Sequence, residues 1–301
     1  MYRTGITELP KEIGQLSSLT HLNLGGTEIT ALPKEIGRLS SLTHLDLWGT
    51  EITKLPKEIT QLSSLTYFSL EGSRMKKLPK EVTQLSSLTH LFLENAWIAE
   101  LPKEIGQLSS LTHLNLGGTW IAELPKEIGQ LSSLVELNLT DLKKITELPK
   151  EIGQLSSLTR LILRQSYITE LPKEIGWLSS LTHLDLDYSR QITELPKEIG
   201  RLSSLTHLNL ERTEITALPK MIGQLSSLIY LDLSGTKISE LPKEIDQLFS
   251  LIQLDLTNTS ITEFRKEFLD SHQNVVLHEK FTNVPRSQEG SVTKLPTSRN
   301  F

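Results

Sequence analysis

Histidine side chains occur in this sequence at a spacing that could bind a metal ion or respond to pH. Six of the eight histidines occupy one position of a pattern that repeats every 23 or 24 residues, namely His21, His44, His90, His113, His183 and His207. They form three pairs in adjacent repeats, and neighbouring strands would hold each pair about 5 Å apart. Two such imidazoles could share a zinc ion, with Asp46 or Asp185 as a third ligand, whereas a usual zinc site has three or four ligands.

Duplication of the repeat unit accounts for the same histidines without any site, because a histidine in the original unit is copied with it. We prefer this interpretation, and the sequence predicts no metal site and no cofactor. A mild pH response is compatible with it. Imidazolium ions in a row repel one another as the pH falls towards about 6, and nearby carboxylates offset part of that repulsion.

No motif typical of catalysis accompanies the histidines. The sequence lacks a GxxxxGK[ST] phosphate loop, HExxH, GxSxG and an EF-hand loop. It contains no cysteine, which excludes thiol nucleophiles and thiolate metal ligands. A repeated open unit also offers no enclosed, desolvated place for catalytic groups. The chain is therefore predicted not to be an enzyme.

The elements that position these side chains are copies of one unit. Versions of PKEIGQL return eleven times between Pro10 and Leu248, and a period of this length is typical of a solenoid. Within residues 19–42, Leu22 and Leu24 alternate with polar residues, as in a short half-buried strand. The proline of each unit suits the first position of a short helical turn. No unit can bury its leucines alone, so stacked units should form one parallel sheet.

Residues 1 to about 268 resemble the leucine-rich repeat family, in the subclass with the pattern LxxLxLxx(N/T)xIxxLPxxIGxLxxL. The resemblance implies an α/β fold, a right-handed horseshoe solenoid with parallel strands on the concave face and short helices or helical turns on the convex face. Members of this subclass include Ras-pathway scaffolds, plant immune receptors and bacterial proteins, among them multidomain GTPases.

The repeats define one domain, residues 1–280, with about eleven units of which the first is incomplete. Residues 260–280 are expected to form an improvised C-terminal cap, in which Phe264 and Phe268 replace the Leu and Ile of the LPKEI segment. Residues 281–301 are polar and are expected to form a disordered tail.

Two features modify the turn that follows each strand. Two units have 24 residues, and their extra residues, near Lys143 and Arg190, predict small bulges. A row of hydroxyl side chains replaces the family's usual asparagine ladder, and we expect a backbone group of a neighbouring turn to bind each hydroxyl. The row consists of Thr27, Thr50, Thr119, Thr213, Thr236, Thr259, Ser73, Ser166 and Ser189.

Protein binding is predicted from side chains that break the repeat on the concave face and its rim. Exposed large apolar side chains commonly mark protein contacts. Tyr67, Phe92, Trp97 and Trp120 lie in consecutive units and could form one patch, although drift at tolerant positions would also produce them. The predicted partner-binding residues are Trp48, Tyr67, Phe92, Trp97, Trp120, Arg160, Ile162, Arg164, Tyr167, Asp185, Tyr188 and Tyr230.

The outward strand positions also carry more acidic than basic residues. This face is either a solvated surface or the complement of a partner with a basic patch. The acidic residues are Asp46, Glu71, Glu94, Glu136, Asp185, Asp187, Glu211, Asp232 and Asp255, against Arg160, Arg164 and Arg212.

Charge and hydropathy argue against other partners. The net charge is -5 without a run of Lys or Arg, which disfavours nucleic acid and anionic membranes. No stretch approaches the roughly 18 apolar residues of a membrane span. The first ten residues lack the pattern of a signal peptide, and the absence of cysteine favours a reducing compartment, so a cytoplasmic location is expected.

The leading interpretation is a non-enzymatic module that binds a protein partner on its concave face. An alternative is the regulatory or sensing repeat region of a larger signalling protein, immune-receptor-like or multidomain GTPase-like. A third is a structural adhesin or spacer. The oligomeric state stays open.

Overall fold

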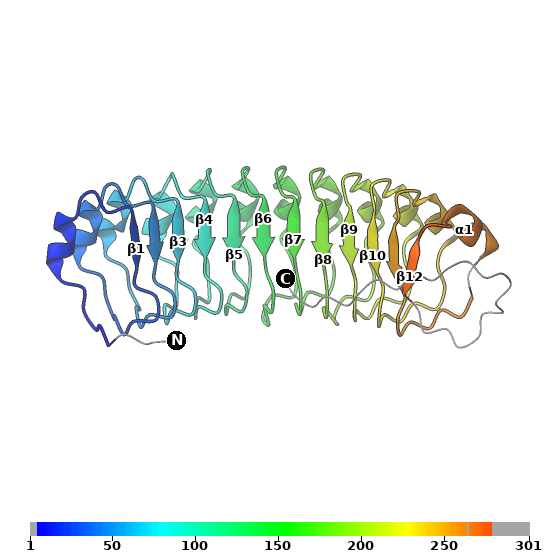
Figure 1. Ribbon diagram of the computed structural model, residues 1–301, viewed down its shortest axis with the longest axis horizontal. Helices are drawn as coiled ribbons and strands as arrows, with labels where there is room; N and C mark the ends of the chain where they lie inside the picture. Colours follow the sequence, from blue (N-terminus) through cyan, green and yellow to red (C-terminus); the bar gives the residue numbers. More distant parts are fainter. Residues whose placement is uncertain (1–4, 264, 279–301) are drawn as a thin grey trace.

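The computed structural model describes residues 5–263 and 265–278, and within them all strands belong to one parallel sheet. Twelve strands of three residues follow one another in chain order, as Figure 1 shows. The strands are β1 (His21–Asn23), β2 (His44–Asp46), β3 (Tyr67–Ser69), β4 (His90–Phe92), β5 (His113–Asn115), β6 (Glu136–Asn138), β7 (Arg160–Ile162), β8 (His183–Asp185), β9 (His207–Asn209), β10 (Tyr230–Asp232), β11 (Gln253–Asp255) and β12 (Val276–His278).

A five-residue 3-10 helix precedes each of the first eleven strands. A proline stands directly before each helix, and its ring fixes the backbone at the point where the helix begins. Each proline is the N-cap of its helix, whereas the sequence pattern placed it at the first helical position, one residue further on. In the second of these helices, for example, the Ile36 N–H donates to the Pro33 carbonyl at 3.0 Å. These helices are η1 (Lys11–Gln15), η2 (Lys34–Arg38), η3 (Lys57–Gln61), η4 (Lys80–Gln84), η5 (Lys103–Gln107), η6 (Lys126–Gln130), η7 (Lys150–Gln154), η8 (Lys173–Trp177), η9 (Lys197–Arg201), η10 (Lys220–Gln224) and η11 (Lys243–Gln247).

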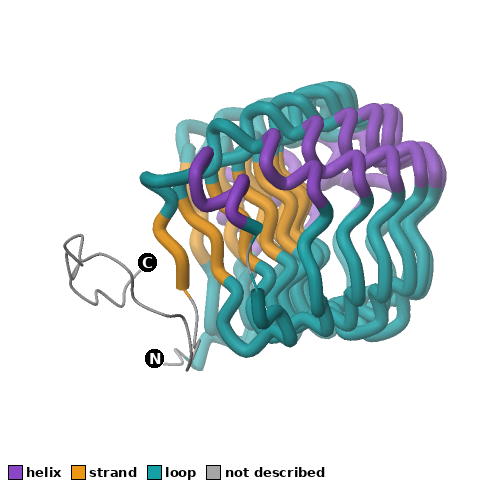
Figure 2. Tube along the Cα trace, turned by 90° about the vertical axis from the view of Figure 1, so that its right-hand side faces the viewer, coloured by secondary structure: helices purple, strands orange, loops and turns teal. Residues whose placement is uncertain are grey.

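The core is a continuous seam of leucine and isoleucine between the strands and the 3-10 helices. Figure 2 shows the strands along one side of the solenoid and the helices on another. Leu45 at the centre of β2, Ile36 of η2 and Ile52 after the turn have no exposed surface. The strands pair in register, so Leu22 lies beside Leu45, and each apolar position continues as a row from one repeat to the next. The predicted leucine-rich repeat solenoid is confirmed.

Most hydroxyls of the row donate to carbonyl groups, but the expected partner was wrong for most of them, and Ser73 Oγ is buried without a hydrogen-bond partner among the described residues. Thr50 Oγ1 donates to the Leu47 carbonyl at 2.8 Å, so the acceptor lies three residues earlier in the same turn. Ser189 does reach a neighbouring repeat, donating to the Leu163 carbonyl at 2.6 Å. A local bond forms more readily because the tight turn already brings the hydroxyl and that carbonyl together.

The C-terminal end of the described chain closes the solenoid with different elements. Helix α1 (Lys266–Ser271) buries Phe268, and β12 adds to the sheet beside β11. His272 is also buried, and its Nε2 lies 3.1 Å from the Leu248 carbonyl oxygen. Phe264 and the predicted tail, residues 281–301, lie outside the described residues. Among the described residues, no helix has the length and apolar character to cross a membrane.

We expect Gly153→Ala to destabilise the solenoid. A Cβ at this position of η7 would lie 2.4 Å from the Glu174 carbonyl oxygen in the next repeat, so the two repeats must move apart. Overpacking of this kind costs about 1–3 kcal/mol. The urea midpoint should fall for Gly153→Ala and stay unchanged for the neighbouring exposed-site control Gln154→Ala. Equal midpoints for the two variants would show that the glycine does not set the repeat spacing.

Candidate protein-binding face

The first and third residues of each strand point away from the core. Together with the two residues that follow the next buried leucine, as Trp48 and Gly49 follow Leu47, they form what we call the strand face. In most strands the first and third residues are partly exposed while the middle residue is buried, as in His44, Leu45 and Asp46 of β2. Since the strands pair in register, residues at equivalent positions lie side by side in rows along the sheet. The strand face is therefore built from rows, and each row can be examined by itself.

The first row contains two stacks of rings. His21 and His44 have ring centroids 4.1 Å apart, and His44 continues to Tyr67 at 5.5 Å. Tyr67 leads to His90 at 6.3 Å, which stacks on His113 at 4.4 Å. The first stack therefore extends without a break over five strands.

A second, shorter stack joins His183, His207 and Tyr230, with centroids 4.3 and 5.8 Å apart. An ion pair occupies the same row between the two stacks, where Arg160 Nε lies 3.0 Å from Glu136 Oε2. The strand face thus has two aromatic segments separated by a charged pair.

Hydrogen bonds to the hydroxyl of the preceding threonine fix the orientation of these imidazoles. Thr43 Oγ1 donates its proton to the Thr20 carbonyl at 3.0 Å, so its contact with His44 Nδ1 at 2.8 Å must be one in which the ring donates. The same arrangement holds His90 and His113. A neutral ring in this position carries its proton on Nδ1 and leaves Nε2 as an acceptor.

Stacking also disfavours the charged form of the histidines. Partial burial lowers the pKa of His44, His90 and His183, and the adjacent histidine of each pair lowers it further. Burial, followed by Arg160, lowers the pKa of His207. In the part of the chain that the structure describes, no three His, Cys, Asp or Glu residues gather closely enough to hold a metal ion.

The third row is mainly structural, which changes the meaning of the predicted acidic face. In most strands an Asn or Asp side chain accepts the backbone N–H two residues later and so ends the strand, as Asp46 does for Trp48 at 3.0 Å. One carboxylate oxygen of Asp185, Asp232 and Asp255 is used in the same way. The residues that make this bond are Asn23, Asp46, Asn115, Asn138, Asp185, Asn209, Asp232 and Asp255.

Two apolar residues interrupt this structural row. Phe92 and Ile162 have no side-chain acceptor, so neither can bind the N–H two residues later. Both are only partly buried. Phe92 instead packs its ring 5.3 Å from Tyr67 and 6.0 Å from His90, which widens the first aromatic stack. At both positions the chain gives up a strand-ending bond for an apolar surface.

Carboxylates crowd together beyond strands β8 to β11. Burial, followed by the charge of Asp185, raises the pKa of Asp187 to about 6. Among the described residues, Oδ1 of Asp187 is buried without a hydrogen-bond partner. Burial also raises the pKa of Glu211, with Asp187 and Asp232 as the next causes. Unlike the third-row aspartates, Asp187 and Glu211 are not used to end a strand. This cluster is one part of the predicted acidic face that is not used to end strands; Glu71, whose pKa is raised by burial and then by Glu94, is another.

Neighbouring polar groups partly neutralise the cluster. Arg164 Nε lies 2.6 Å from Asp185 Oδ2, and the Tyr230 hydroxyl donates to Asp232 Oδ2 at 2.8 Å. Burial and that hydrogen bond raise the pKa of Tyr230. Arg164, Asp185 and Tyr230 were all predicted from sequence as binding residues, and the structure places them in this one region.

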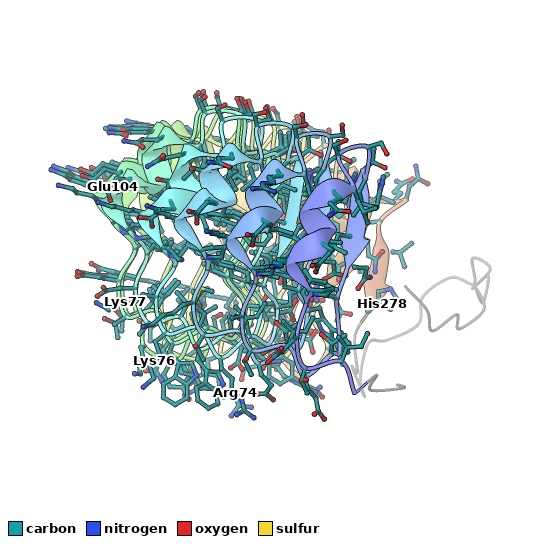
Figure 3. The ribbon with its side chains drawn as sticks, turned by 90° about the vertical axis from the view of Figure 1, so that its left-hand side faces the viewer. Arg74, Lys76, Lys77, Glu104 and His278 are labelled. Carbon is teal, nitrogen blue, oxygen red and sulfur yellow. The ribbon has the colours of Figure 1, made fainter. Side chains whose placement is uncertain are left out.

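The rim aromatics are exposed but do not join the patch that the sequence suggested. Trp97 is 49% exposed and Trp120 is 55% exposed, and their ring partners are Arg74 and Lys144, at 5.9 and 5.0 Å from the centroids. Figure 3 shows Arg74 on the same rim as Lys76 and Lys77. Trp48 is only partly exposed, because its ring lies against Gly26, 3.3 Å from the position that a Cβ of this glycine would occupy. Tyr67 and Phe92 therefore form one cluster, and the rim tryptophans a separate surface.

The turn after each strand includes one residue with positive φ, and three consecutive turns use unusual residues there. Other turns have glycine, asparagine or aspartate, which tolerate this backbone. Gln165, Tyr188 and Arg212 adopt it with φ of 55°, 58° and 52°. The Tyr188 ring lies 4.5 Å from the Arg212 guanidinium and 5.9 Å from that of Arg190. Predicted residues Tyr167 and Tyr188 both belong to this region.

Sequence reasoning missed an apolar surface near the C-terminal end. Phe249 is 80% exposed and Ile252 is 55% exposed, with Ile229 in the preceding repeat. The signal was present, because Phe249 replaces the first serine after leucine in the LSSL segment, and Ile229 and Ile252 stand where other units have threonine.

Family models match most of the repeats. A model described as a leucine-rich repeat region matches residues 34–96 and 88–161, and one described as leucine rich repeat matches residues 156–215, 179–238 and 203–261. The chain belongs to the leucine-rich repeat family. No curated protein matches it.

Solved structures of leucine-rich repeat proteins resemble this one over most of its length. A leucine-rich repeat protein of Leptospira interrogans is 39% identical with a TM-score of 0.75, over 91% of this chain and 75% of that chain. A TDR receptor is 25% identical with a TM-score of 0.73, and this chain spans 53% of it. The plant peptide hormone receptor RGFR1, solved in complex with RGF2, is 24% identical with a TM-score of 0.63 over 91% of this chain and 50% of that chain, which shows the fold alone.

We expect the stacked histidines of this leucine-rich repeat protein to destabilise it in mild acid. Their pKa values lie below 6.5 in the folded state, so the unfolded chain binds protons more tightly. Their contribution to stability is lost as the pH falls from about 6.5 through the folded-state pKa values. NMR titration should give midpoints below 6.5 for His44, His90, His183 and His207.

The carboxylates whose pKa is raised add to the stability of the fold as the pH falls, so a variant is needed to isolate the contribution of the histidines. Replacing these four histidines by glutamine should reduce the loss of stability between pH 7 and pH 5. Imidazole midpoints at or above 6.5 would show that stacking does not disfavour the charged form.

Proposed function

We propose that this leucine-rich repeat protein is a non-enzymatic recognition module that binds a protein partner on its strand face. The observation that carries the proposal is the pair of apolar replacements, Phe92 and Ile162, in a row that otherwise ends strands. Each gives up a backbone hydrogen bond and leaves an apolar side chain partly exposed. Apolar surface kept at such a cost to the fold is typical of a binding surface.

The rings around Phe92 form the anchor of this surface. Tyr67, His90 and Phe92 lie on neighbouring strands in mutual ring contact, and the stack continues to His44 and His113. Stacking and threonine bonds hold these rings before any partner arrives, so binding orders few side chains. A rigid aromatic surface of this type suits an apolar or aromatic side chain of the partner.

The carboxylates beyond β8 to β11 favour a partner with a basic patch. Asp187 and Glu211 are partly buried next to other carboxylates, and their pKa values are raised first by burial and then by the neighbouring negative charges. A lysine or arginine of the partner would relieve that crowding. The partner would then place an apolar group over β3 to β5 and a basic group over β8 to β11.

A second candidate is the sensing region of a larger signalling protein. The likeness to a TDR receptor at 25% identity, of which this chain spans 53%, favours it. We also propose a cytoplasmic location, supported by the absence of cysteine. Fractionation of the source cells, with an antibody to the chain, checks the location, and recovery in the secreted fraction would contradict it.

We expect Phe92→Asn and Ile162→Asn to weaken partner binding without harming the fold. Asparagine restores the strand-ending bond that Asn115 makes in the neighbouring repeat, at 3.0 Å, so the urea midpoint should stay constant or rise. Loss of a buried apolar anchor should lower the affinity about tenfold or more. The measurement is calorimetric titration with a partner captured from an extract of the source cells.

Trp177→Ala is the matched control, because Trp177 is 54% exposed on η8, away from the strand face. It should bind as the wild type does. A partner that binds Phe92→Asn and Ile162→Asn at wild-type affinity, or that is lost with Trp177→Ala, would place the binding surface elsewhere.

We expect affinity for the partner to fall as salt is added. The carboxylates around Asp187 and Glu211 act over distances that salt screens, with a Debye length of about 10 Å at 0.1 M. Titrations at increasing sodium chloride should show weaker binding for the wild type and a smaller change for Asp187→Asn combined with Glu211→Gln. Salt-independent binding by the wild type would contradict the basic patch.

A further inference from the structure

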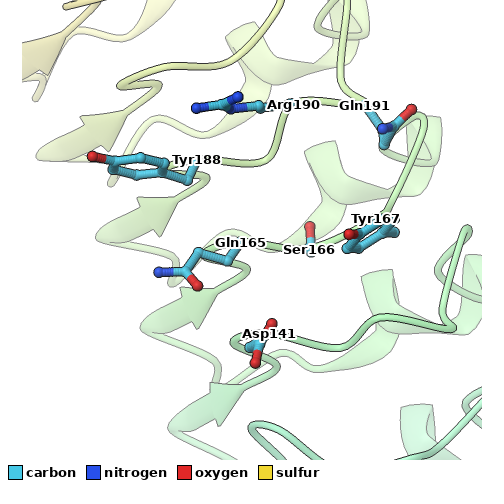
Figure 4. Close-up of a pocket in the computed structure, with 7 residues that line it drawn as sticks. All are labelled: Asp141, Gln165, Ser166, Tyr167, Tyr188, Arg190 and Gln191. Atoms are coloured by element: carbon cyan, nitrogen blue, oxygen red, sulfur yellow. The ribbon is translucent and has the colours of Figure 1, made fainter.

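A hollow lies on the turn side of repeats six to eight, and the lengths of three turns explain it. The two 24-residue units place an extra residue after Asp141 and after Tyr188, whereas the unit between them has none. The middle turn, around Ser166, is therefore recessed between two longer ones. The turn hollow, shown in Figure 4, has a volume of about 390 Å³ and is lined by Asp141, Gln165, Ser166, Tyr167, Tyr188, Arg190 and Gln191.

The lining combines amides, phenol rings and one cation whose charge is not neutralised. Gln165, Tyr167, Arg190 and Gln191 are all exposed. Arg190 lies near the Tyr188 ring and forms no ion pair within residues 5–263 and 265–278, unlike Arg164 and Arg160.

The one carboxylate that lines the hollow already has a cation. Asp141 Oδ2 lies 3.5 Å from Lys143 Nζ, outside the lining. Figure 4 shows Asp141 on one side of the hollow and Arg190 on the other, with Gln165 and Ser166 between them. The group that the hollow lacks is therefore an anion beside Arg190.

The backbone around the hollow is strained, and the residues that bear the strain include its lining. Gln165 and Tyr188 have positive φ where the equivalent turns at Gly118 and Gly235 use glycine. A left-handed backbone is unfavourable for any residue with a Cβ atom and is routine only for glycine. Strained residues persist where the surrounding structure holds them, and they cluster at binding sites. Glycine would relieve the strain but would remove the amide and the ring from the hollow.

We propose that the turn hollow binds an aspartate or glutamate side chain of an extended peptide segment. Arg190 pairs with the carboxylate in the planar two-bond geometry that guanidinium favours. Gln165 and Gln191 each offer a donor and an acceptor, which matches a peptide group on either side of that residue. Tyr167 and Tyr188 pack against the segment. This rests on the proposed function, since the segment belongs to the protein partner, and it adds an acidic residue to that partner.

The test uses blocked pentapeptides, because the partner itself is unidentified. Acetyl-AAEAA-amide should shift the NMR signals of Gln165, Gln191 and Arg190 and bind more tightly than acetyl-AAQAA-amide. Arg190→Gln should lower the affinity for the glutamate peptide about tenfold, to that of the glutamine peptide. Arg201→Gln is the matched control, an exposed arginine of η9 with no ion pair among the described residues. It should change nothing.

Deleting Gln191 distinguishes binding that needs the shape of the hollow from binding that needs only the charge of Arg190. It restores the 23-residue spacing while keeping Arg190, so a folded variant should lose the glutamate peptide. Circular dichroism and the melting temperature establish that each variant is folded, and Arg190→Gln decides the matter if the deletion variant is not.

Three results would overturn the proposal: equal binding of the two peptides, unchanged binding by Arg190→Gln, or preference for acetyl-AAQAA with a free C-terminal carboxylate, which would assign the hollow to a chain end. None of these results bears on Phe92 and Ile162, so the proposal for the turn hollow and the proposal for the strand face are tested independently. If the Phe92→Asn and Ile162→Asn variants bind the partner as the wild type does while the glutamate peptide still binds the hollow, the hollow is a peptide site but the proposed strand-face partner is wrong.

Discussion

The distance between successive repeats is the constraint on which this structure depends. Parallel pairing holds each strand in register with the next, and in most units the glycine of the PKEIG segment lets the 3-10 helices approach until its Cα faces the backbone of the following repeat. Every position of the strand then becomes part of a row along the sheet. A side chain on the strand face is therefore surrounded by its equivalents in the two adjacent repeats, and their types decide its stacking, its pKa and its exposure.

The rows differ in how far the fold itself uses their side chains. The third row ends strands, and the threonine before most first-row histidines binds both a carbonyl and the imidazole, so identical residues along these rows need no partner to explain them. This is why repetition alone is a poor guide to function here. The informative positions are those where a residue cannot perform the structural task of its row, as at Phe92 and Ile162, because something other than folding must account for them.

The fold could be predicted almost completely from sequence, and the candidate face only in part. Alternating leucines and the recurring proline indicated strands and helical turns, because each pattern has a direct geometric cause. The use of Asp185 and Asp255 to end strands was not predicted, since an aspartate in a repeat looks the same whether its carboxylate faces solvent or its own turn. Among the described residues, Phe92 makes ring contacts with Tyr67 and His90 and not with Trp97, and closeness in repeat number alone does not tell whether two rings touch. The hollow depends on the relative lengths of three turns, and its depth follows only from coordinates.

Departures that cost stability are concentrated between β7 and β9. Ile162 lacks the strand-ending bond, Gln165, Tyr188 and Arg212 hold a left-handed backbone, and Asp187 keeps a carboxylate oxygen buried without a partner. Accidental replacement has no physical reason to collect unfavourable residues in consecutive turns, because each lowers the stability of the same few interfaces and their costs add within one region. Their side chains do share a place, since they border either the turn hollow or the carboxylates beside it. The binding proposed above accounts for such residues gathering at one location, whereas the structural task of each repeat does not.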